Sequence, residues 1–262
     1  KVGSKLILIS AQFRENQLYF KWFGGFGRCA LKLFDQIFLV DSNSEKLLHQ
    51  IGVKSTTVCG DTRYDRVMGI AQNVETIPEI AQFKGEGKLV VCGSTWPEDE
   101  RLLAKSVESL KETKWVIAPH EVGEENIQCL ERLFPDSVRL SGLSNQDAKV
   151  VLVDSIGQLN KLYKHADVAY IGGAFKTGLH NILEATAYGI PTVFGPDYTR
   201  FPDAGEMVEK GLAFTISNQS ELNNKLDVLL EKKQSQLNSD VLSFMSARKG
   251  ATSAILEYTN KC

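Results

Sequence analysis

The sequence contains few cysteines, and none of them are paired at a spacing typical of metal or redox chemistry. The five are Cys29, Cys59, Cys92, Cys129 and Cys262. No two form a Cys-x-x-Cys motif, which argues against a zinc ribbon and a dithiol redox site. Because an odd number also disfavours a secreted disulfide framework, we expect free thiols in a reducing cytosol.

The sequence also lacks long apolar runs and long runs of one charge. No apolar stretch approaches the roughly 18 residues of a membrane span, and no signal peptide is visible. The net charge is only −2, so no nucleic-acid partner is expected. The chain starts at Lys1 and enters the apolar run Leu6–Ile9 almost at once. We therefore expect that a further segment precedes it in the full-length protein.

Two common catalytic motifs are missing as well. There is no Gly-x-Ser-x-Gly nucleophile elbow and no Walker phosphate loop, which excludes the corresponding hydrolases and nucleotide triphosphatases. What remains is an ordinary globular composition, with 43% apolar and 24% charged residues in 262. This length suits one large domain or two small ones.

Short apolar runs alternate with amphipathic stretches along the chain. Strands are expected at Leu6–Ser10, Gln36–Val40, Ser55–Cys59, Lys88–Cys92, Trp115–Ala118, Val150–Val153, Val168–Ile171, Thr192–Phe194 and Leu212–Ile216. Helices are expected at Leu18–Phe34, Ser44–Ile51, Glu98–Lys111, Glu124–Phe134, Gln158–His165, Leu179–Tyr188, Asp203–Lys210 and Glu221–Lys232. This alternation predicts an α/β fold built from parallel βαβ units, in which continuous Val/Ile/Leu strands are covered on both faces.

The pattern divides the chain into three parts. Residues 1–60 contain too few strands for a complete Rossmann-like sheet, whereas residues 61–238 contain about six, enough for a whole domain. Residues 239–262 read as one long helix that Gly250 could kink.

The most informative segment runs from Ile171 to Glu184. A strand ends at Gly172-Gly173, a short loop follows, and a helix is expected from Leu179. Glycines allow close approach of a ligand, and a helix N-terminus favours phosphate. Glu184 could accept hydrogen bonds from ribose hydroxyls. An ordinary strand-to-helix turn remains the alternative.

Two further strands end in polar residues. Ser94 and Thr95 follow one of them, and Pro119 and His120 follow the next. Because ligands bind at the carboxyl ends of strands in open α/β sheets, these residues could complete one pocket. Simple helix capping explains Ser94 and Thr95 about equally well.

His180 and Glu184 stand four residues apart, a spacing that could hold a metal ion. No third ligand stands nearby in the sequence, so we expect no metal and no other cofactor. Residues 17–34 combine aromatic side chains with Lys21, Arg28 and Lys32. That combination suits a membrane interface or a lipid acceptor, although a helix packed on a sheet is an equally good reading.

Several segments, taken together, resemble the bacterial 3-deoxy-D-manno-octulosonic acid (Kdo) transferase family in order and spacing. They are Ile9–Arg14, Gly60–Val67, Gly93–Glu100, Ala118–Glu121, Gly172–Phe175 with His180–Glu184, and Gly189–Pro196.

The resemblance implies a GT-B-type glycosyltransferase with two Rossmann-like domains. Residues 1–60 would be the remaining part of the acceptor-side domain, and residues 61–238 the complete donor domain. The enzyme would transfer Kdo from CMP-Kdo to a lipid A precursor at the cytoplasmic face of the inner membrane. The family's general base, a glutamate, would lie in the missing N-terminal segment, so no catalytic residue is assigned here.

By the same resemblance, the donor would be held by residues from several motifs. They are Arg63, Ser94, Thr95, Pro119, His120, Gly172, Gly173, Lys176, His180, Asn181 and Glu184. Many family members have an arginine where this chain has His120, which leaves Lys176, Arg63 or a helix N-terminus to neutralise the phosphate. Another GT-B enzyme using a UDP-sugar, and a non-catalytic nucleotide-binding fragment, are the alternatives.

Overall fold

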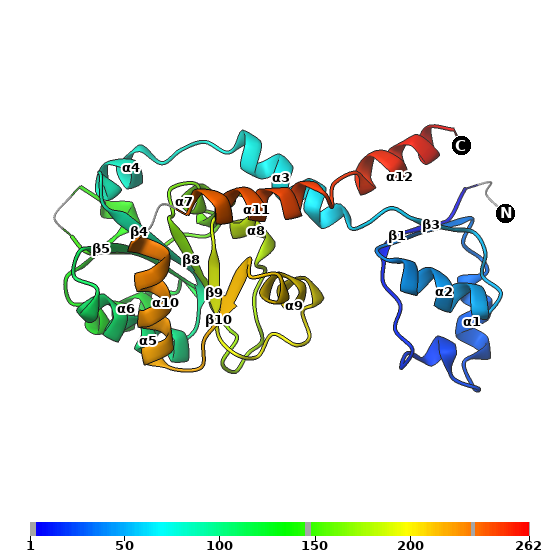
Figure 1. The fold of residues 1–262 in the computed structure, drawn as a ribbon, viewed down its shortest axis with the longest axis horizontal. Coiled ribbons are helices and arrows are strands. Elements are labelled where there is room, and N and C mark those ends of the chain that lie inside the picture. Colours follow the sequence, from blue (N-terminus) through cyan, green and yellow to red (C-terminus); the bar gives the residue numbers. More distant parts are fainter. Residues whose placement is uncertain (1–3, 145–147, 232–233, 262) are drawn as a thin grey trace. The chain divides into compact units, whose positions relative to one another are not determined.

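The computed structural model of the chain describes residues 4–144, 148–231 and 234–261. The chain forms two compact units (Figure 1). Unit 1 comprises residues 1–67 together with residues 245–262, and unit 2 comprises residues 68–244. The last stretch of the chain therefore belongs with the first.

The strands of the two units alternate with helices along most of the chain. The strands are β1 (Ile7–Ala11), β2 (Gln36–Leu39), β3 (Thr56–Val58), β4 (Lys88–Thr95), β5 (Thr113–Pro119), β6 (Ser137–Arg139), β7 (Val150–Leu152), β8 (Val168–Ile171), β9 (Thr192–Phe194) and β10 (Ala213–Thr215). The α-helices are α1 (Gly25–Leu31), α2 (Ser42–Gln50), α3 (Thr62–Asn73), α4 (Pro78–Lys84), α5 (Pro97–Ser109), α6 (Glu124–Leu133), α7 (Leu159–Tyr163), α8 (Leu183–Thr186), α9 (Pro202–Glu209), α10 (Gln219–Glu231), α11 (Ser235–Ser246) and α12 (Ala251–Asn260). Two 3₁₀ turns, η1 (Leu18–Phe20) and η2 (Leu140–Gly142), complete the set.

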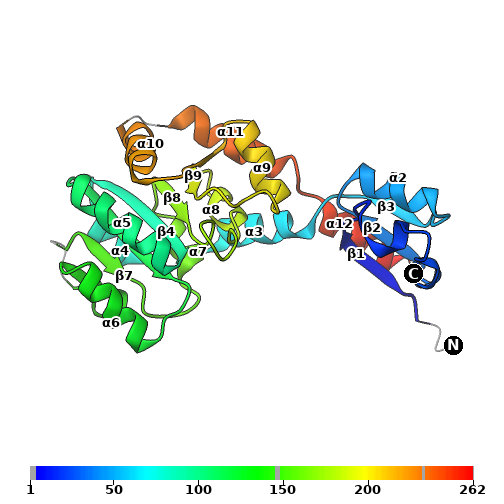
Figure 2. The same cartoon turned by 90° about the horizontal axis from the view of Figure 1, so that it is seen from below.

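Unit 2 is built on a seven-stranded parallel sheet in the order β10-β9-β8-β4-β5-β7-β6. The central strand, β4, is a nearly continuous apolar run, as expected for a strand covered on both faces. Val90 and Cys92 point toward a core that includes side chains of α5, α6 and α10. Gly93 points the other way, where α7 packs so closely that a Cβ would lie 2.0 Å from the Tyr163 hydroxyl. Helices thus cover both faces (Figure 2).

Unit 1 has a three-stranded parallel sheet in the order β1-β2-β3. Alternate residues of β2 serve its two faces, because successive strand side chains point in opposite directions. Ile37 and Leu39 belong to a core cluster with side chains of α1 and α2. Phe38, between them, stacks edge-on against Tyr258 of α12 at 5.5 Å.

All nine expected strands are confirmed, most to within a residue or two at each end. The α/β class with parallel sheets is confirmed as well. The short edge strand β6 and the helices α3 and α4 were not anticipated. β6 has only three residues, all partly exposed, so it lacks the apolar run that identifies a strand.

Three expected helices differ from those found. Residues 18–34 form η1 and α1 instead of one helix, because a Cβ at Gly24 would lie 2.0 Å from the Leu18 carbonyl oxygen in the tight turn between them. The helix expected over 179–188 is the single turn α8, from Leu183 to Thr186. The helix expected over 239–260 is two helices, α11 and α12, separated at Gly250, whose φ is +118°.

Candidate functional site

The order of the strands in unit 2 singles out one place in the sheet. From β4 the chain continues to β5 on one side, and after β7 it returns to place β8 on the other side of β4. The carboxyl ends of β4 and β8 therefore flank a topological switch point, the usual ligand-binding crevice of open α/β sheets. Ser94 and Thr95 end β4, and Gly172 and Gly173 follow β8.

The two strand ends approach each other closely at Gly172. A Cβ on this residue would lie 2.3 Å from the Ser94 carbonyl oxygen and 2.7 Å from the Thr95 Cα. Ser94 itself has a φ of +53°, rare for a residue with a side chain, at an irregularity in the pairing of β4 with β5. Such strained backbone is often found at functional sites.

Asp99 ties this arrangement together from the first turn of α5. Its Oδ2 accepts the backbone N–H groups of Trp96 at 3.0 Å and Gly173 at 2.9 Å. Its Oδ1 accepts the hydroxyl of Tyr170 at 2.7 Å. The side chain is buried, and this burial raises the pKa of the carboxyl although all three hydrogen bonds act to lower it. Asp99 thus fixes the loop after β8 relative to the start of α5.

Several groups expected to contact a ligand are occupied inside the protein. The Thr95 hydroxyl is buried and donates to Glu100 at 3.0 Å. The backbone N–H of Gly173 is taken by Asp99, and those of Lys176, Thr177 and Gly178 donate to the Gly173 carbonyl. A helix N-terminus at Leu179 does not form, because the helix begins only at Leu183. The expectation of a helix N-terminus at Leu179 is therefore wrong.

Three aromatic rings meet at the site, each from a different strand end. The indole Nε1 of Trp96 donates to Nε2 of His180 at 2.8 Å, and the two rings are within 10° of coplanar. The His120 ring lies over both, with centroids 4.6 Å from Trp96 and 4.8 Å from His180. Burial, followed by the neighbouring His120, lowers the pKa of His180.

A hollow of about 170 Å³ opens beside this ring group. Its walls come from the ends of β4 and β5 and from the loop that joins β7 to α7, and they include Ser94, Pro119, His120, Val153, Ile156 and Gln158. Ile156 is 85% exposed at its rim. Apolar walls with a few polar groups are typical of small-molecule sites.

The other expected residues lie around the site or outside unit 2. Lys176 is exposed and forms an ion pair with Glu98 at 3.2 Å. Asn181 donates to Glu184 at 3.2 Å and accepts from the N–H of Leu183. Arg63 belongs to unit 1, where its guanidinium pairs with Asp61 at 2.8 Å.

Sequence reasoning brought together Ser94, Pro119, His120, Gly172, Gly173 and His180, which the structure gathers at one edge. It missed the roles of Trp96 and Asp99. A signal for Asp99 was present, since an acid three residues after a helix N-cap often accepts the N-cap N–H. Trp96 gave no comparable signal, because its partner His180 is distant in sequence.

Within the described ranges, no group of three or more His, Cys, Asp and Glu side chains could hold a metal ion. In the same residues, no helix is both long enough and apolar enough to cross a membrane.

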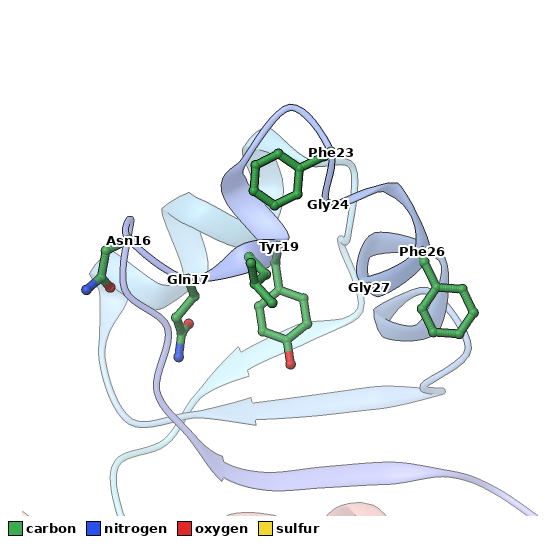
Figure 3. Close-up of a pocket in the computed structure, with 8 residues that line it drawn as sticks. Asn16, Gln17, Tyr19, Phe23, Gly24, Phe26 and Gly27 are labelled. Carbon is green, nitrogen blue, oxygen red and sulfur yellow. The ribbon is translucent and has the colours of Figure 1, made fainter.

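Unit 1 carries a second hollow, of about 580 Å³, in its aromatic segment. Figure 3 shows Gln17, Tyr19 and Phe23 close together and Phe26 on the neighbouring helix, all among the residues that line the hollow. Tyr19 is half-buried and packs edge-on against the core residue Phe13 at 5.8 Å.

The outer aromatic residues of this segment are open to solvent. Trp22 and Phe26 are each 91% exposed, and Phe23 is 58% exposed. Arg28 holds the turn beneath them, because its guanidinium donates to the carbonyl oxygens of Tyr19 at 3.2 Å and Lys21 at 2.8 Å. We call residues 18–33, with these exposed rings, the aromatic loop.

No protein-family model matches the chain. Curated relatives do: a 3-deoxy-D-manno-octulosonic acid transferase of Aquifex aeolicus is 30% identical over 78% of this chain and 56% of its own length. Those of Rickettsia bellii and Chlamydia trachomatis are 24% and 26% identical over 88% and 90% of the chain. These matches confirm the resemblance to Kdo transferases. The chain spans about half the length of the curated relatives it matches.

Solved structures agree on the fold. The C-terminal CMP-Kdo binding domain of WaaA from Acinetobacter baumannii covers 68% of this chain, with a TM-score of 0.55 and 20% identity. A putative UDP-N-acetylglucosamine 2-epimerase from Listeria monocytogenes covers 96%, with a TM-score of 0.63 and 18% identity. At these identities the likeness shows the fold alone, and it confirms the GT-B-type class.

Proposed function

We propose that this chain is the donor-binding part of a glycosyltransferase that moves Kdo from CMP-Kdo to a lipid A precursor. The observation that carries the proposal is the similarity to curated Kdo transferases over 78–90% of the chain. The geometry of unit 2 supports it, because a small-molecule hollow, a ring group and a lysine gather at the topological switch point.

The hollow beside Ser94 suits the nucleoside. Pro119, Val153 and Ile156 provide apolar walls for the faces of a base, while the hydroxyl of Ser94 and the amide of Gln158 can bond to its polar edge. Glu184, at the start of α8, is proposed to accept from the ribose hydroxyls. Thr95 would act indirectly, by holding the end of β4 through Glu100.

The phosphate would lie by the loop after Gly173. Its partners are His120, His180, Asn181 and the ammonium group of Lys176. Charge develops on the departing CMP as the bond between the phosphate oxygen and the sugar breaks, and preorganised donors stabilise that charge most.

The acceptor hydroxyl attacks the sugar carbon and gives its proton to a general base. We assign no described residue to this role. The proposed base is a glutamate upstream of the chain, as the resemblance to Kdo transferases implies. No metal ion is needed in this scheme, because the leaving phosphate is balanced by protein cations and hydrogen-bond donors.

The aromatic loop supports contact with a lipid. Exposed rings such as Trp22 and Phe26, beside Lys21 and Lys32, are typical of surfaces that rest in a membrane interface. We propose that this loop meets the inner membrane or the acyl chains of the acceptor at its cytoplasmic face.

Calorimetric titration of the 262-residue chain with CMP and with UDP tests the donor. We expect CMP to bind in a one-to-one complex and UDP to bind far more weakly. Gly173→Asp should abolish CMP binding, because a Cβ there would lie 2.3 Å from the Gly178 carbonyl oxygen. The control is Gly205→Asp on α9, where no atom lies within 4 Å of an added Cβ. Preferential binding of UDP would favour a UDP-sugar enzyme and contradict the proposal.

A transfer assay separates an enzyme from a nucleotide-binding fragment. The full-length protein should transfer Kdo from CMP-Kdo to a lipid A precursor. The same full-length protein with Glu184→Ala should lose donor affinity. An active full-length protein whose donor affinity is unchanged by Glu184→Ala would contradict the site.

A further inference from the structure

Trp96 and His180 form a planar hydrogen-bonded pair, and the reaction scheme above gives Trp96 no role. The Nε1–H group of Trp96 points at Nε2 of His180 over 2.8 Å, with the rings only 10° from coplanar. Trp96 stands between β4 and α5, and His180 stands in the loop after β8. The pair therefore joins the two strand ends that flank the switch point.

The direction of this hydrogen bond fixes the state of His180. An indole nitrogen can only donate, so Nε2 must be the unprotonated, accepting nitrogen of the imidazole. In the neutral ring the proton then resides on Nδ1. Charging the ring would place a second N–H opposite the indole N–H, and the hydrogen bond would be lost.

The other ring nitrogen is available to a ligand. Nδ1 of His180 makes no hydrogen bond within the described part of the chain, and this atom is not buried. Solvent or a ligand can therefore reach it. His180 also lies against Gly173, whose added Cβ would be 2.9 Å from the ring carbon Cδ2.

We propose that Trp96 is a positioning residue, whose indole N–H holds His180 in the Nδ1–H tautomer and so makes His180 a hydrogen-bond donor to an anionic phosphate oxygen of the bound nucleotide. The identity of that nucleotide rests on the proposed function. The tautomer itself does not, because it follows from the geometry of the unliganded rings.

Two titratable groups act on His180. His120, from the end of β5, stacks on it at 4.8 Å and opposes its charging. Asp99, from α5, favours its charging. Burial is the largest influence, and together these leave the pKa of His180 below its ordinary value of 6.5. Removing the indole N–H removes a bond that only the unprotonated Nε2 can accept, so the pKa should rise.

Nitrogen-15 NMR of the imidazole rings in the 262-residue chain tests the tautomer directly. In the parent chain we expect a protonated Nδ1 and an unprotonated Nε2 at His180. Trp96→Phe keeps a ring beneath His120 but removes the donor. It should release the Nε2–H tautomer and raise the titration midpoint of His180. The matched control is Trp22→Phe, in the other unit, which should change neither. An unchanged tautomer in Trp96→Phe would overturn the proposal.

Titration with CMP tests the consequence. Trp96→Phe should bind CMP about tenfold more weakly, the loss expected for one hydrogen bond to a charged group. The amide of His180→Asn can place an N–H near the position of Nδ1 without help from Trp96. Trp96→Phe should therefore cost no further affinity in the His180→Asn background. An equal loss in both backgrounds would mean that Trp96 acts only through packing, and would overturn the proposal.

The two hypotheses fail differently. If the parent chain does not bind CMP at all, the proposed function fails, while the NMR result still decides the tautomer. If CMP binds and Trp96→Phe alters neither the tautomer nor the affinity, the positioning role fails and the function stands.

Discussion

The carboxylate of Asp99 accepts the backbone N–H of Gly173 at 2.9 Å, although the two residues are 74 positions apart in the chain. The same carboxylate takes the N–H of Trp96 and the hydroxyl of Tyr170. One buried side chain thus sets the backbone on both sides of the switch point. The loop after β8 is therefore fixed by a side chain distant in the sequence as well as by its own backbone hydrogen bonds.

Asp99→Ala should lower the free energy of unfolding by about 2–3 kcal/mol, because it leaves buried donors without partners. It should also weaken CMP binding, since the Gly173 loop loses its anchor. Asp99→Asn should cost less than about 1 kcal/mol, because its oxygen can serve both N–H groups and its amide can donate to a reoriented Tyr170 hydroxyl. Urea unfolding and calorimetry measure both effects. Equal losses in the two variants would show that the hydrogen bonds do not matter.

Gly172→Ala should destabilise unit 2 by about 2 kcal/mol or more, since its Cβ would lie 2.3 Å from the Ser94 carbonyl oxygen and overpack the strand ends. The control is Gly205→Ala in α9, where an added Cβ meets nothing within 4 Å. That variant should gain about 0.5–1 kcal/mol from the better helix former. Thermal unfolding compares the stability of the two variants. A Gly172→Ala chain as stable as the parent would refute the close approach of the β4 and β8 ends at this residue.

Asp65 of α3 should stabilise α12 in a pH-dependent way. Its carboxylate accepts the N–H groups of Gly250 at 2.8 Å and Thr252 at 3.0 Å. Burial alone raises the pKa of Asp65, but these backbone bonds outweigh it and the pKa lies below the ordinary 3.8. The stabilisation is therefore present above pH 3.8 and is lost as the pH falls through the lowered pKa.

Asp65→Ala should cost about 1 kcal/mol, as for other lost N-caps, at neutral pH. Hydrogen exchange at the amides of α12 measures the change. The difference between the parent chain and the variant should shrink in acid. A difference that persists well below pH 3.8 would contradict the role of the charged carboxylate.

The double variant Trp22→Ser, Phe26→Ser should bind anionic phospholipid vesicles about tenfold more weakly, because both rings are 91% exposed and available to the lipid. Stability should change by less than about 0.5 kcal/mol per site, since neither ring is in the core. Val228→Ser, at another exposed apolar residue, is the control. Vesicle sedimentation measures binding by the parent chain, the double variant and the control. An equal loss of vesicle binding in Val228→Ser would contradict a specific role of the aromatic loop.

The sequence was most informative where apolar runs are continuous. β4 and β9 could be located because a strand covered on both faces is a continuous apolar run, which is easy to recognise in a sequence. The edge strand β6 was not predicted, because its three half-exposed residues form no apolar run. The helix expected over 179–188 is longer than α8, because Leu179, Ile182 and Leu183 are all buried although only Leu183 lies in the helix. The spacing of apolar residues therefore does not show where this helix begins.

The candidate site was predictable only at the level of backbone position. Glycines and small polar residues at strand ends locate Ser94, His120 and Gly172, since parallel strands finish at one edge. Which side chains pair across that edge depends on tertiary contacts. The bond from Trp96 to His180 spans 84 positions, and no local rule anticipates it.

Helix α12 gives the chain a definite order of assembly. Tyr258 packs on Phe38 of β2, and Asp65 holds the first amides of the helix, so unit 1 lacks a covering for one face of its sheet until residues 251–260 exist. On the ribosome, all of unit 2 emerges before that helix does. The sheet of unit 1 is therefore synthesised before that of unit 2 but completed after it, and a nascent chain arrested before Ala251 should present Phe38 to chaperones.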